Sequence, residues 1–291
     1  MSVTLPHWTP GNRECCFNRL WLVSSVATQR GHRKAQGLSR KLDGVRSKNR
    51  RQNGATSASS GADSRRSKSL TKRAFGGFLR LIVVLAVSLF LPAWTLHYWQ
   101  AWLFLAVFSM SALAITIYLA KEDPKLLERR IQGGSRAEKE RSQQIIQLLA
   151  AIAFIALIIL PAVDHRFGWS SMPPFLVATG DILVALGFLI VFFVFKENTF
   201  TSATIEVSDE QKVISTGPYA LVRHPMYIGV LVMLSGVPLA LGSWWGMLMI
   251  IPMTLVIVWR LLDEETFLAK KLPGYAEYRN NVKYRLLPFI W

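Results

Sequence analysis

Most side chains that could do chemistry beside an apolar run lie in one turn-rich segment, residues 217–229. Gly217-Pro218 and His224-Pro225 are turn signals seven residues apart, so we do not expect a plain helix between them. At the edge of a bilayer, irregular backbone is tolerated only against protein or a wet cavity. We therefore expect a ligand-binding segment, and the alternative is an ordinary loop with a basic anchor. Its polar side chains are Tyr219, Arg223, His224 and Tyr227.

Four ionisable residues end the last apolar run: Arg260, Asp263, Glu264 and Glu265. Each would cost about 2.5–3.5 kcal/mol at the centre of a bilayer, so we expect them at the interface or in a polar cavity. Arg260 and Glu264 are four residues apart and share one helix face. An exposed pair of this kind contributes only about 0.3–0.5 kcal/mol, too little to explain its position by stability alone. The alternative interpretation is that these four residues have no functional role and only extend their charged groups into the lipid headgroups.

The two groups together predict a cleft. One helical hairpin joins the basic, histidine-containing segment to the acidic helix end, so the two can face each other as separated positive and negative charges. A cleft open to cytosol and lipid would suit a zwitterionic cofactor and a lipidic acceptor. A six-helix transporter or a scaffold without catalytic activity could use the same charges as an ion relay.

Composition divides the chain into two parts. The 291 residues are 51% hydrophobic, yet the formal net charge is +16. Residues 1–73 hold sixteen Lys and Arg and three acidic residues, so they supply +13 of that charge. The nearly neutral remainder contains apolar runs of 17 to 23 residues, the length that a helix needs to cross a hydrocarbon core of about 30 Å. We expect a multi-pass integral membrane protein.

The apolar runs predict an all-α fold, a membrane helical bundle of about six transmembrane helices. The predicted spans are roughly 75–96, 98–120, 145–163, 175–195, 226–241 and 244–262. The loop 121–144 holds seven basic residues, so the positive-inside rule predicts that this loop and both termini are cytoplasmic. Gly242-Ser243 is expected to form a tight turn on the outer side. The sequence does not distinguish a bacterial inner membrane from the endoplasmic reticulum.

The basic tail, residues 1–73, is predicted to be disordered, because it offers too little apolar surface to offset the entropy of ordering. A dispensable tail, an organellar targeting peptide and an anionic-lipid or nucleic-acid tether remain open. Nucleic acid is not an expected partner, since aromatic residues do not interleave the basic ones in the way that stacking platforms would require. The only cysteines, Cys15 and Cys16, lie in this tail, so the membrane domain, residues 74–291, has no disulfide or thiolate metal site.

A short helix is predicted in the basic loop. Asp123 reads as an N-cap and Pro124 as the first helical residue. The following residues are amphipathic, so this helix should lie on the membrane surface, with a solvated connector as the alternative. Its apolar residues are Leu126, Leu127 and Ile131, and its basic residues are Lys125, Arg129 and Arg130.

The residues 215–229, Ser-Thr-Gly-Pro-Tyr-Ala-Leu-Val-Arg-His-Pro-Met-Tyr-Ile-Gly, are followed by Trp259-Arg260 and Glu264-Glu265. This combination resembles the isoprenylcysteine carboxyl methyltransferase family and its phospholipid-methyltransferase relatives. The resemblance covers residues 196–291, the expected cofactor-site half of the membrane domain. Residues 123–130 look like the upstream part of bacterial members, whereas residues 1–73 have no counterpart.

The resemblance implies a membrane enzyme that uses S-adenosylmethionine, bound at the cytoplasmic face, to methylate a carboxylate of a lipidic or prenylated acceptor. Arg260 matches an arginine that holds the substrate in eukaryotic members, and we assign it the catalytic role. By position, the implied cofactor contacts are Gln211, Lys212, Val213, Ile214, Tyr219, His224, Pro225, Met226, Tyr227 and Glu264.

Methyl transfer from a sulfonium to a carboxylate cancels opposite charges, so a dry site favours it and no general base is needed at pH 7. An amine methyltransferase acting on a phospholipid headgroup would need a base, for which Asp263, Glu265 or His224 could serve. A sterol-type reductase is a third enzyme class to consider. Neither the acceptor nor the oligomeric state follows from the sequence.

Overall fold

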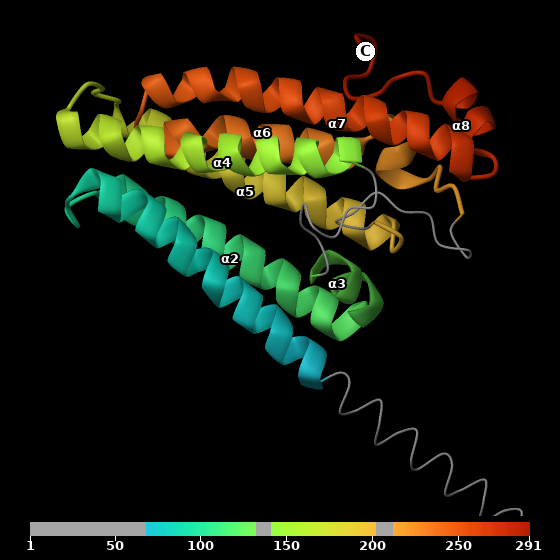
Figure 1. The fold of residues 1–291 in the computed structure, drawn as a ribbon, viewed down its shortest axis with the longest axis horizontal. Helices are drawn as coiled ribbons and strands as arrows, with labels where there is room; N and C mark the ends of the chain where they lie inside the picture. Colours follow the sequence, from blue (N-terminus) through green and yellow to red (C-terminus); the bar gives the residue numbers. More distant parts are fainter. Residues whose placement is uncertain (1–67, 132–140, 202–211) are drawn as a thin grey trace, which may run out of the picture. The chain divides into compact units, whose positions relative to one another are not determined.

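The computed structural model describes residues 68–131, 141–201 and 212–291, and these residues form helices and connections without a strand (Figure 1). The first described helix is Lys68–Ala93. The long helices that follow are α2 (Trp99–Glu122), α4 (Arg141–Phe167), α5 (Pro174–Glu197), α6 (Pro225–Ala240) and α7 (Ile250–Lys271). The short ones are α3 (Pro124–Ile131), η1 (Gly217–Ala220), η2 (Trp245–Met249) and α8 (Tyr275–Asn281).

Each of the six predicted spans falls on one of these helices, which confirms the all-α membrane bundle. Five described helices are long and apolar enough to cross a membrane, with η2 and α7 counted as one helix, so the chain is an integral membrane protein. The sixth, α6, has 16 residues and is therefore only about 24 Å long. It begins at Pro225, directly after the turn-rich segment.

Two helices extend beyond the membrane spans predicted for them. The first described helix begins at Lys68, so the predicted limit of the tail at residue 73 lies inside it, and residues 1–67 lie outside the described residues. Leu70 of this helix belongs to the same buried apolar cluster as Leu126 and Leu127 of α3. The last helix, α7, continues nine residues beyond the predicted end at residue 262. Its charged residues have protein partners, described below, that allow the helix to continue.

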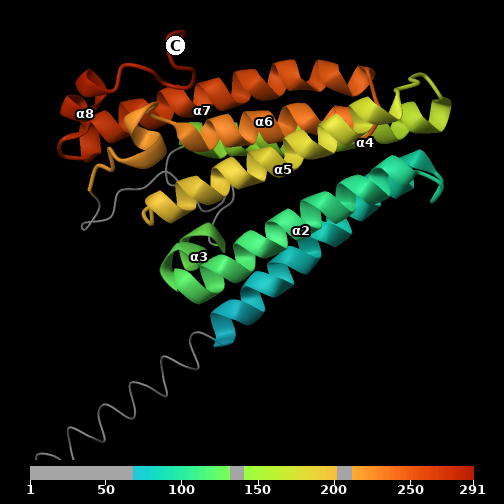
Figure 2. The ribbon, with the colours of Figure 1, turned by 180° about the vertical axis from the view of Figure 1, so that it is seen from behind.

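Helices α5 and α6 pack closely through glycines (Figures 1 and 2). A Cβ atom on Gly236 of α6 would lie 2.5 Å from the carbonyl oxygen of Gly180 on α5. A Cβ atom on Gly187 would lie 2.6 Å from the carbonyl oxygen of Gly229. Small residues at both contacts let the two backbones approach, as is common between membrane helices. This contact fixes the start of α6 beside the end of α5.

The end of the bundle that carries Gly242-Ser243 is closed by neutral donors around one buried acid. Gly242 has a φ of +71°, a conformation that favours glycine, and Ser243 is buried. The hydroxyl groups of Ser243 and Ser170 both donate to the carboxylate of Asp164. The Tyr98 hydroxyl donates to the Leu241 carbonyl oxygen at 2.6 Å. The predicted tight turn is confirmed, and we call this the turn end.

The opposite end, which we call the site end, gathers α3, η1 and α8. The predicted N-cap of α3 is confirmed, because the Leu126 N–H donates to Asp123 Oδ1 at 2.9 Å. Leu126 and Leu127 are buried against α2 and Phe195 of α5, so α3 packs on protein through this face. The end of α5 is tied to the start of η1, since the Thr216 hydroxyl donates to the carboxylate of Glu197.

Candidate functional site

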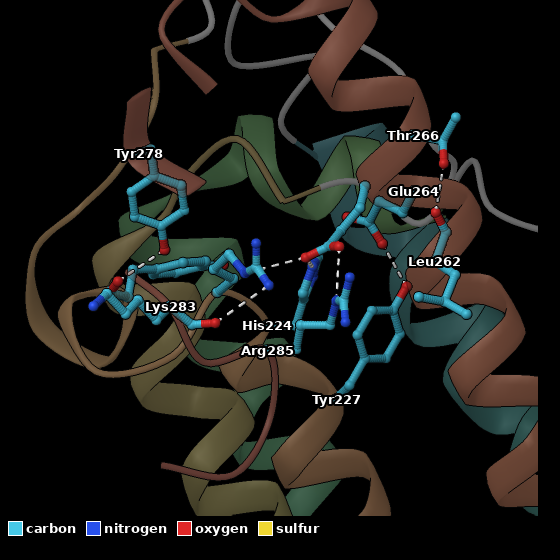
Figure 3. Close-up of polar contacts among 11 residues, drawn as sticks. His224, Tyr227, Leu262, Glu264, Thr266, Tyr278, Lys283 and Arg285 are labelled. Carbon is cyan, nitrogen blue, oxygen red and sulfur yellow. Dashed lines mark hydrogen bonds and ion pairs between the residues drawn. The ribbon is translucent and has the colours of Figure 1, made fainter. Parts of the chain in front are cut away.

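Glu265 is the centre of a buried charge cluster, which we call the Glu265 cluster. Its Oε1 lies 3.2 Å from Arg223 Nε and 3.3 Å from His224 Nε2, and its Oε2 lies 2.9 Å from Arg285 Nε. The side chains of Glu265, Arg223 and His224 are each about 6% exposed. Figure 3 shows His224 and Arg285 converging on the same point from different parts of the chain. One carboxylate thus joins α7 to the turn-rich segment and to the chain that follows α8.

The same three parts of the chain are joined through their backbones. The N–H groups of Arg223 and His224 donate to the carbonyl oxygens of Tyr284 and Arg285, at 2.9 and 3.0 Å. The Tyr278 hydroxyl of α8 donates to the Tyr219 carbonyl oxygen at 2.8 Å. The segment after α8 therefore holds residues 219–224 in place. This explains why the predicted bent backbone is a short 3-10 turn, η1, followed by irregular residues up to Pro225.

A second group, which we call the Tyr227 group, consists of Tyr227, Glu264 and Arg260. The Tyr227 hydroxyl, at the start of α6, donates to Glu264 Oε2 of α7 at 2.5 Å (Figure 3). The same hydroxyl interacts with the Arg260 guanidinium. Arg260 also donates to Gln143 Oε1 of α4 at 3.2 Å. An acid, a phenol and a guanidinium from two helices thus meet at the site end.

Tyr219 and Asn198 extend this group. The Tyr219 side chain makes a hydrogen bond with the Asn198 side chain, directly after α5, and lies within electrostatic range of Glu264. Burial raises the pKa of the Tyr219 hydroxyl, so it remains a neutral group at physiological pH. Two phenols, a carboxylate and a guanidinium can together bind a ligand that carries both an ammonium and a carboxylate.

The carboxylates of Asp263 and Glu265 are both engaged by the protein. Asp263 accepts hydrogen bonds from Ser142, at 3.2 Å, and from Gln143. Glu265 is paired with three cationic or basic groups of the Glu265 cluster. We predicted separated positive and negative charges, but the basic residues of the turn-rich segment contact Glu265 directly. Asp263 thus bonds to two neutral donors of α4, and Glu264 accepts a hydrogen bond from the Tyr227 hydroxyl at the start of α6.

The structure brings together some of the predicted site residues and places others apart. Tyr227 contacts Glu264 and Arg260, and the His224 ring lies 5.8 Å from the Tyr227 ring. Tyr219 lies within electrostatic range of Glu264. Val213 packs against the buried face of α8, and Lys212 is exposed. Ile214 and Met226 are half-buried, Pro225 is buried, and Gln211 lies outside the described residues. The cofactor roles of all these residues stay predictions.

The sequence did not point to three residues that complete the site. Gln143, Asn198 and Arg285 contact the predicted residues from positions far along the chain. Gln143 is a polar residue on an apolar helix and is only 1% exposed, which is the one signal that could have marked it. Asn198 and Arg285 lie in polar stretches where such a residue is common.

Comparison with known proteins finds one family model that matches about a third of the chain, within the part that holds the site. The model of the family described as phospholipid methyltransferase matches residues 175–273, from α5 to the start of α8. This range contains the Tyr227 group and most of the Glu265 cluster. It confirms the predicted resemblance to membrane methyltransferases, and the family implies a methyltransferase. A search of curated proteins found no match.

Proposed function

Since residues 175–273 match the phospholipid methyltransferase family, we propose that this protein is a membrane enzyme that uses S-adenosylmethionine to methylate a carboxylate of a lipidic or prenylated acceptor. The observation that carries the proposal is the Tyr227 group, in which a phenol joins an acid and a guanidinium inside the matched range. The same geometry would have little purpose in a helical hairpin that only crossed the membrane.

The donor set fits the cofactor. S-adenosylmethionine carries an ammonium, a carboxylate and a sulfonium, and it supplies the methyl group as an electrophile. Glu264 would accept hydrogen bonds from the ammonium, since its protein partner in the Tyr227 group is a neutral hydroxyl. Tyr219 and His224 would bind the remainder of the cofactor, and Val213, Ile214, Pro225 and Met226 would provide apolar contacts.

Arg260 would hold the acceptor carboxylate. Gln143 and Tyr227 contact this guanidinium from different helices, so its position is defined before a substrate binds. An arginine can hold a carboxylate through two parallel hydrogen bonds, which orients one oxygen for attack. A carboxylate is already ionised at pH 7, so the protein needs only to position it and exclude water. The acyl or prenyl chain would remain in the bilayer beside α7.

An amine acceptor fits the site less well. Methylation of an ammonium needs a base to remove its proton. Two of the three candidates, Asp263 and Glu265, already accept hydrogen bonds or ion pairs from other parts of the protein. The third, His224, is directed at Glu265.

We also propose that the site end faces the cytoplasm. Arg129 and Arg130 lie on α3, in the basic loop that the positive-inside rule assigns to that side. If the five long helices and α6 of the described residues all cross the membrane, their even number would leave both termini on the cytoplasmic side. Protease accessibility of tags at either terminus in sealed vesicles tests this orientation.

The test of function is methyl transfer by the purified full chain in liposomes. Methyl-labelled S-adenosylmethionine would be supplied with N-acetyl-S-farnesylcysteine in one reaction and with phosphatidylethanolamine in another. A carboxylate acceptor gives a methyl ester that releases labelled methanol in base, whereas an N-methyl product retains its label. We expect the wild type to place base-labile label on the farnesylated acid. The Arg260→Met, Glu264→Gln and His224→Phe proteins should still insert into the membrane but should not transfer this label. Base-stable label on the amine, or full activity in all three variants, would overturn the proposal.

A further inference from the structure

The chain after α8 folds into a closed loop. The Trp291 carbonyl oxygen accepts three hydrogen bonds, at 2.9, 3.1 and 3.2 Å, from the N–H groups of Arg285, Leu286 and Leu287. The Trp291 N–H group donates in turn to the Leu287 carbonyl oxygen at 3.1 Å. The Arg285 guanidinium lies over the Trp291 ring, with its Cζ 5.2 Å from the ring centre. The loop therefore has a defined shape, and we call residues 287–291 its tip.

The tip is apolar and exposed. Its sequence is Leu-Pro-Phe-Ile-Trp, and each of the five residues is exposed. Phe289 and Ile290 are 87% and 78% exposed. Phe289 also has a φ of +67°, a conformation that bulky residues rarely adopt. An apolar cluster held in this way is unfavourable in water, so it indicates a surface that contacts an apolar partner.

The loop lies level with the membrane helices. Leu286, directly before the tip, is buried and belongs to the core cluster of the bundle together with Leu261 of α7. Arg285 pairs with Glu265, which follows the exposed Leu262 of α7 by less than one helical turn. In Figures 1 and 2 the chain after α8 returns along α7, so that its end lies beside that helix and short of α8. The tip is therefore at the level where α7 exposes apolar residues to lipid.

The charges at this end of the molecule suit a lipid surface. Among residues 266–291 the only acidic residue is Glu277. An apolar tip accompanied by basic residues is typical of an interfacial segment, whose apolar side chains enter the membrane while its cations contact lipid phosphates. A water-soluble partner would have to reach a tip that lies level with the membrane helices. The exposed basic residues are Lys270, Lys271, Arg279 and Lys283.

We propose that residues 287–291 form an interfacial anchor, whose apolar side chains enter the headgroup region of the leaflet at the site end. The same loop is joined to the proposed site, since the Arg285 side chain donates to Glu265 and the Arg285 carbonyl oxygen accepts from the His224 N–H group. Contact with lipid thus stabilises the loop that holds this part of the site. This connection rests on the proposed function, whereas the location of the tip does not. The family match ends at residue 273 and does not supply the segment.

Spin labels measure where the tip lies. In the full chain, the two native cysteines are replaced by serine, and a single cysteine is introduced as Phe289→Cys or Ile290→Cys. Glu277→Cys on the exposed face of α8 is the reference for water, and Leu255→Cys on the exposed face of α7 is the reference for lipid. In vesicles of phosphatidylcholine and phosphatidylglycerol, we expect lipid-soluble oxygen to relax both tip labels more than a water-soluble nickel chelate does.

Each result decides the location of the tip. Tip labels that oxygen reaches better than the chelate, as at Leu255→Cys, support the anchor. Labels as accessible to the chelate as at Glu277→Cys would show a tip in water. Labels that neither reagent reaches would show a tip covered by protein, such as a second copy of the chain. Either of the last two results overturns the inference, whatever reaction the protein catalyses.

A matched pair of double variants tests the connection to the site. Phe289→Asn with Ile290→Ser removes the apolar groups, and asparagine tolerates the positive φ of residue 289. Phe289→Leu with Ile290→Val keeps the apolar character. In the same vesicles, we expect the first double variant to bind S-adenosylmethionine about threefold or more weakly than the wild type, and the second to bind like the wild type. Thermal unfolding of both checks that the fold is intact.

The two measurements separate the inference from the proposed function. If the wild type does not bind S-adenosylmethionine, the proposed function fails and the anchor is judged on the spin labels. If the wild type binds it and the two double variants bind it equally well, the connection between the anchor and the site is overturned.

Discussion

Two adjacent glutamates on α7 belong to regions of different character. Glu265 is buried among cationic and basic groups from the turn-rich segment and from the chain after α8. Glu264 is more exposed and accepts its hydrogen bond from a tyrosine hydroxyl. The Glu265 carboxylate is already balanced by two guanidiniums, whereas the Glu264 carboxylate accepts its hydrogen bond from a neutral hydroxyl and can bind a cationic ligand. We infer that Glu265 holds the site end together and that Glu264 serves the ligand.

The largest expected effect comes from the Glu265 cluster. Glu265→Gln leaves Arg223 and Arg285 without their negative partner, and loss of one member of a buried ion pair costs about 3–5 kcal/mol. We expect a fall of this size in the free energy of unfolding, followed by tryptophan fluorescence in detergent. Glu277→Gln on the exposed face of α8 is the control, with a change of less than about 0.5 kcal/mol. Equal stability of the two variants would contradict the structural role of Glu265.

A change in the Tyr227 group should reduce methyl transfer more than it reduces stability. Tyr227→Phe removes the hydroxyl that joins Glu264 to Arg260, and a hydrogen bond to a charged group contributes about 1.5–3 kcal/mol. We expect methyl transfer to fall about tenfold to a hundredfold, with a smaller change in unfolding than Glu265→Gln gives. Tyr118→Phe on α2 removes a hydroxyl outside the site and should retain activity. A Tyr227→Phe enzyme with wild-type rates would remove the distinction between the two regions.

A change at the contact that supports both regions should affect both. A Cβ atom on Gly236 would lie 2.5 Å from the Gly180 carbonyl oxygen, so Gly236→Ala must shift α6 against α5. Overpacking of this kind costs about 1–3 kcal/mol. We expect loss of stability and of activity together, measured by unfolding and methyl transfer on one preparation. Gly76→Ala, where the added Cβ has no neighbour within 4 Å, is the control.

The smallest effect is a pH dependence of stability. Burial raises the pKa of Tyr278 from 10.0 to about 12. Because the folded value is the higher one, the contribution of Tyr278 is present below about pH 10 and is lost as pH rises to about 12. We expect Tyr278→Phe to lower stability at pH 8 and to show a shallower decline above pH 10. Unfolding followed between pH 8 and 12 tests this, and parallel declines in the two proteins would contradict it.

The sequence predicts the bundle well because membrane helices are determined largely by the length of their apolar runs. Helix α7 continues beyond the predicted membrane span, which ends at residue 262, for a physical reason. Hydropathy falls at Asp263, yet the helix continues to Lys271, since its charged residues have partners on α4 and in the segment after α8. Such partners are tertiary contacts, which periodicity does not report.

The candidate site was predictable in its centre and not at its edges. The turn signals and the charged end of α7 point to Tyr227, Glu264 and Arg260, which the structure brings together. Arg130 was predicted to lie on a membrane-surface helix, and its contact with the Phe195 ring depends on how α3 packs on α2 and α5. Arg285 is an ordinary basic residue in the sequence and acquires its role only through contact with Glu265.

Binding of S-adenosylmethionine by Glu264→Gln and Glu265→Gln, with unfolding measured on the same samples, tests the central claim most directly. The account predicts that wild-type protein binds the cofactor and that Glu264→Gln weakens binding about tenfold or more while its stability is retained. Glu265→Gln should lower the free energy of unfolding more than Glu264→Gln does. Wild-type protein that does not bind S-adenosylmethionine, or a Glu264→Gln protein that binds it as tightly as the wild type, would contradict the account.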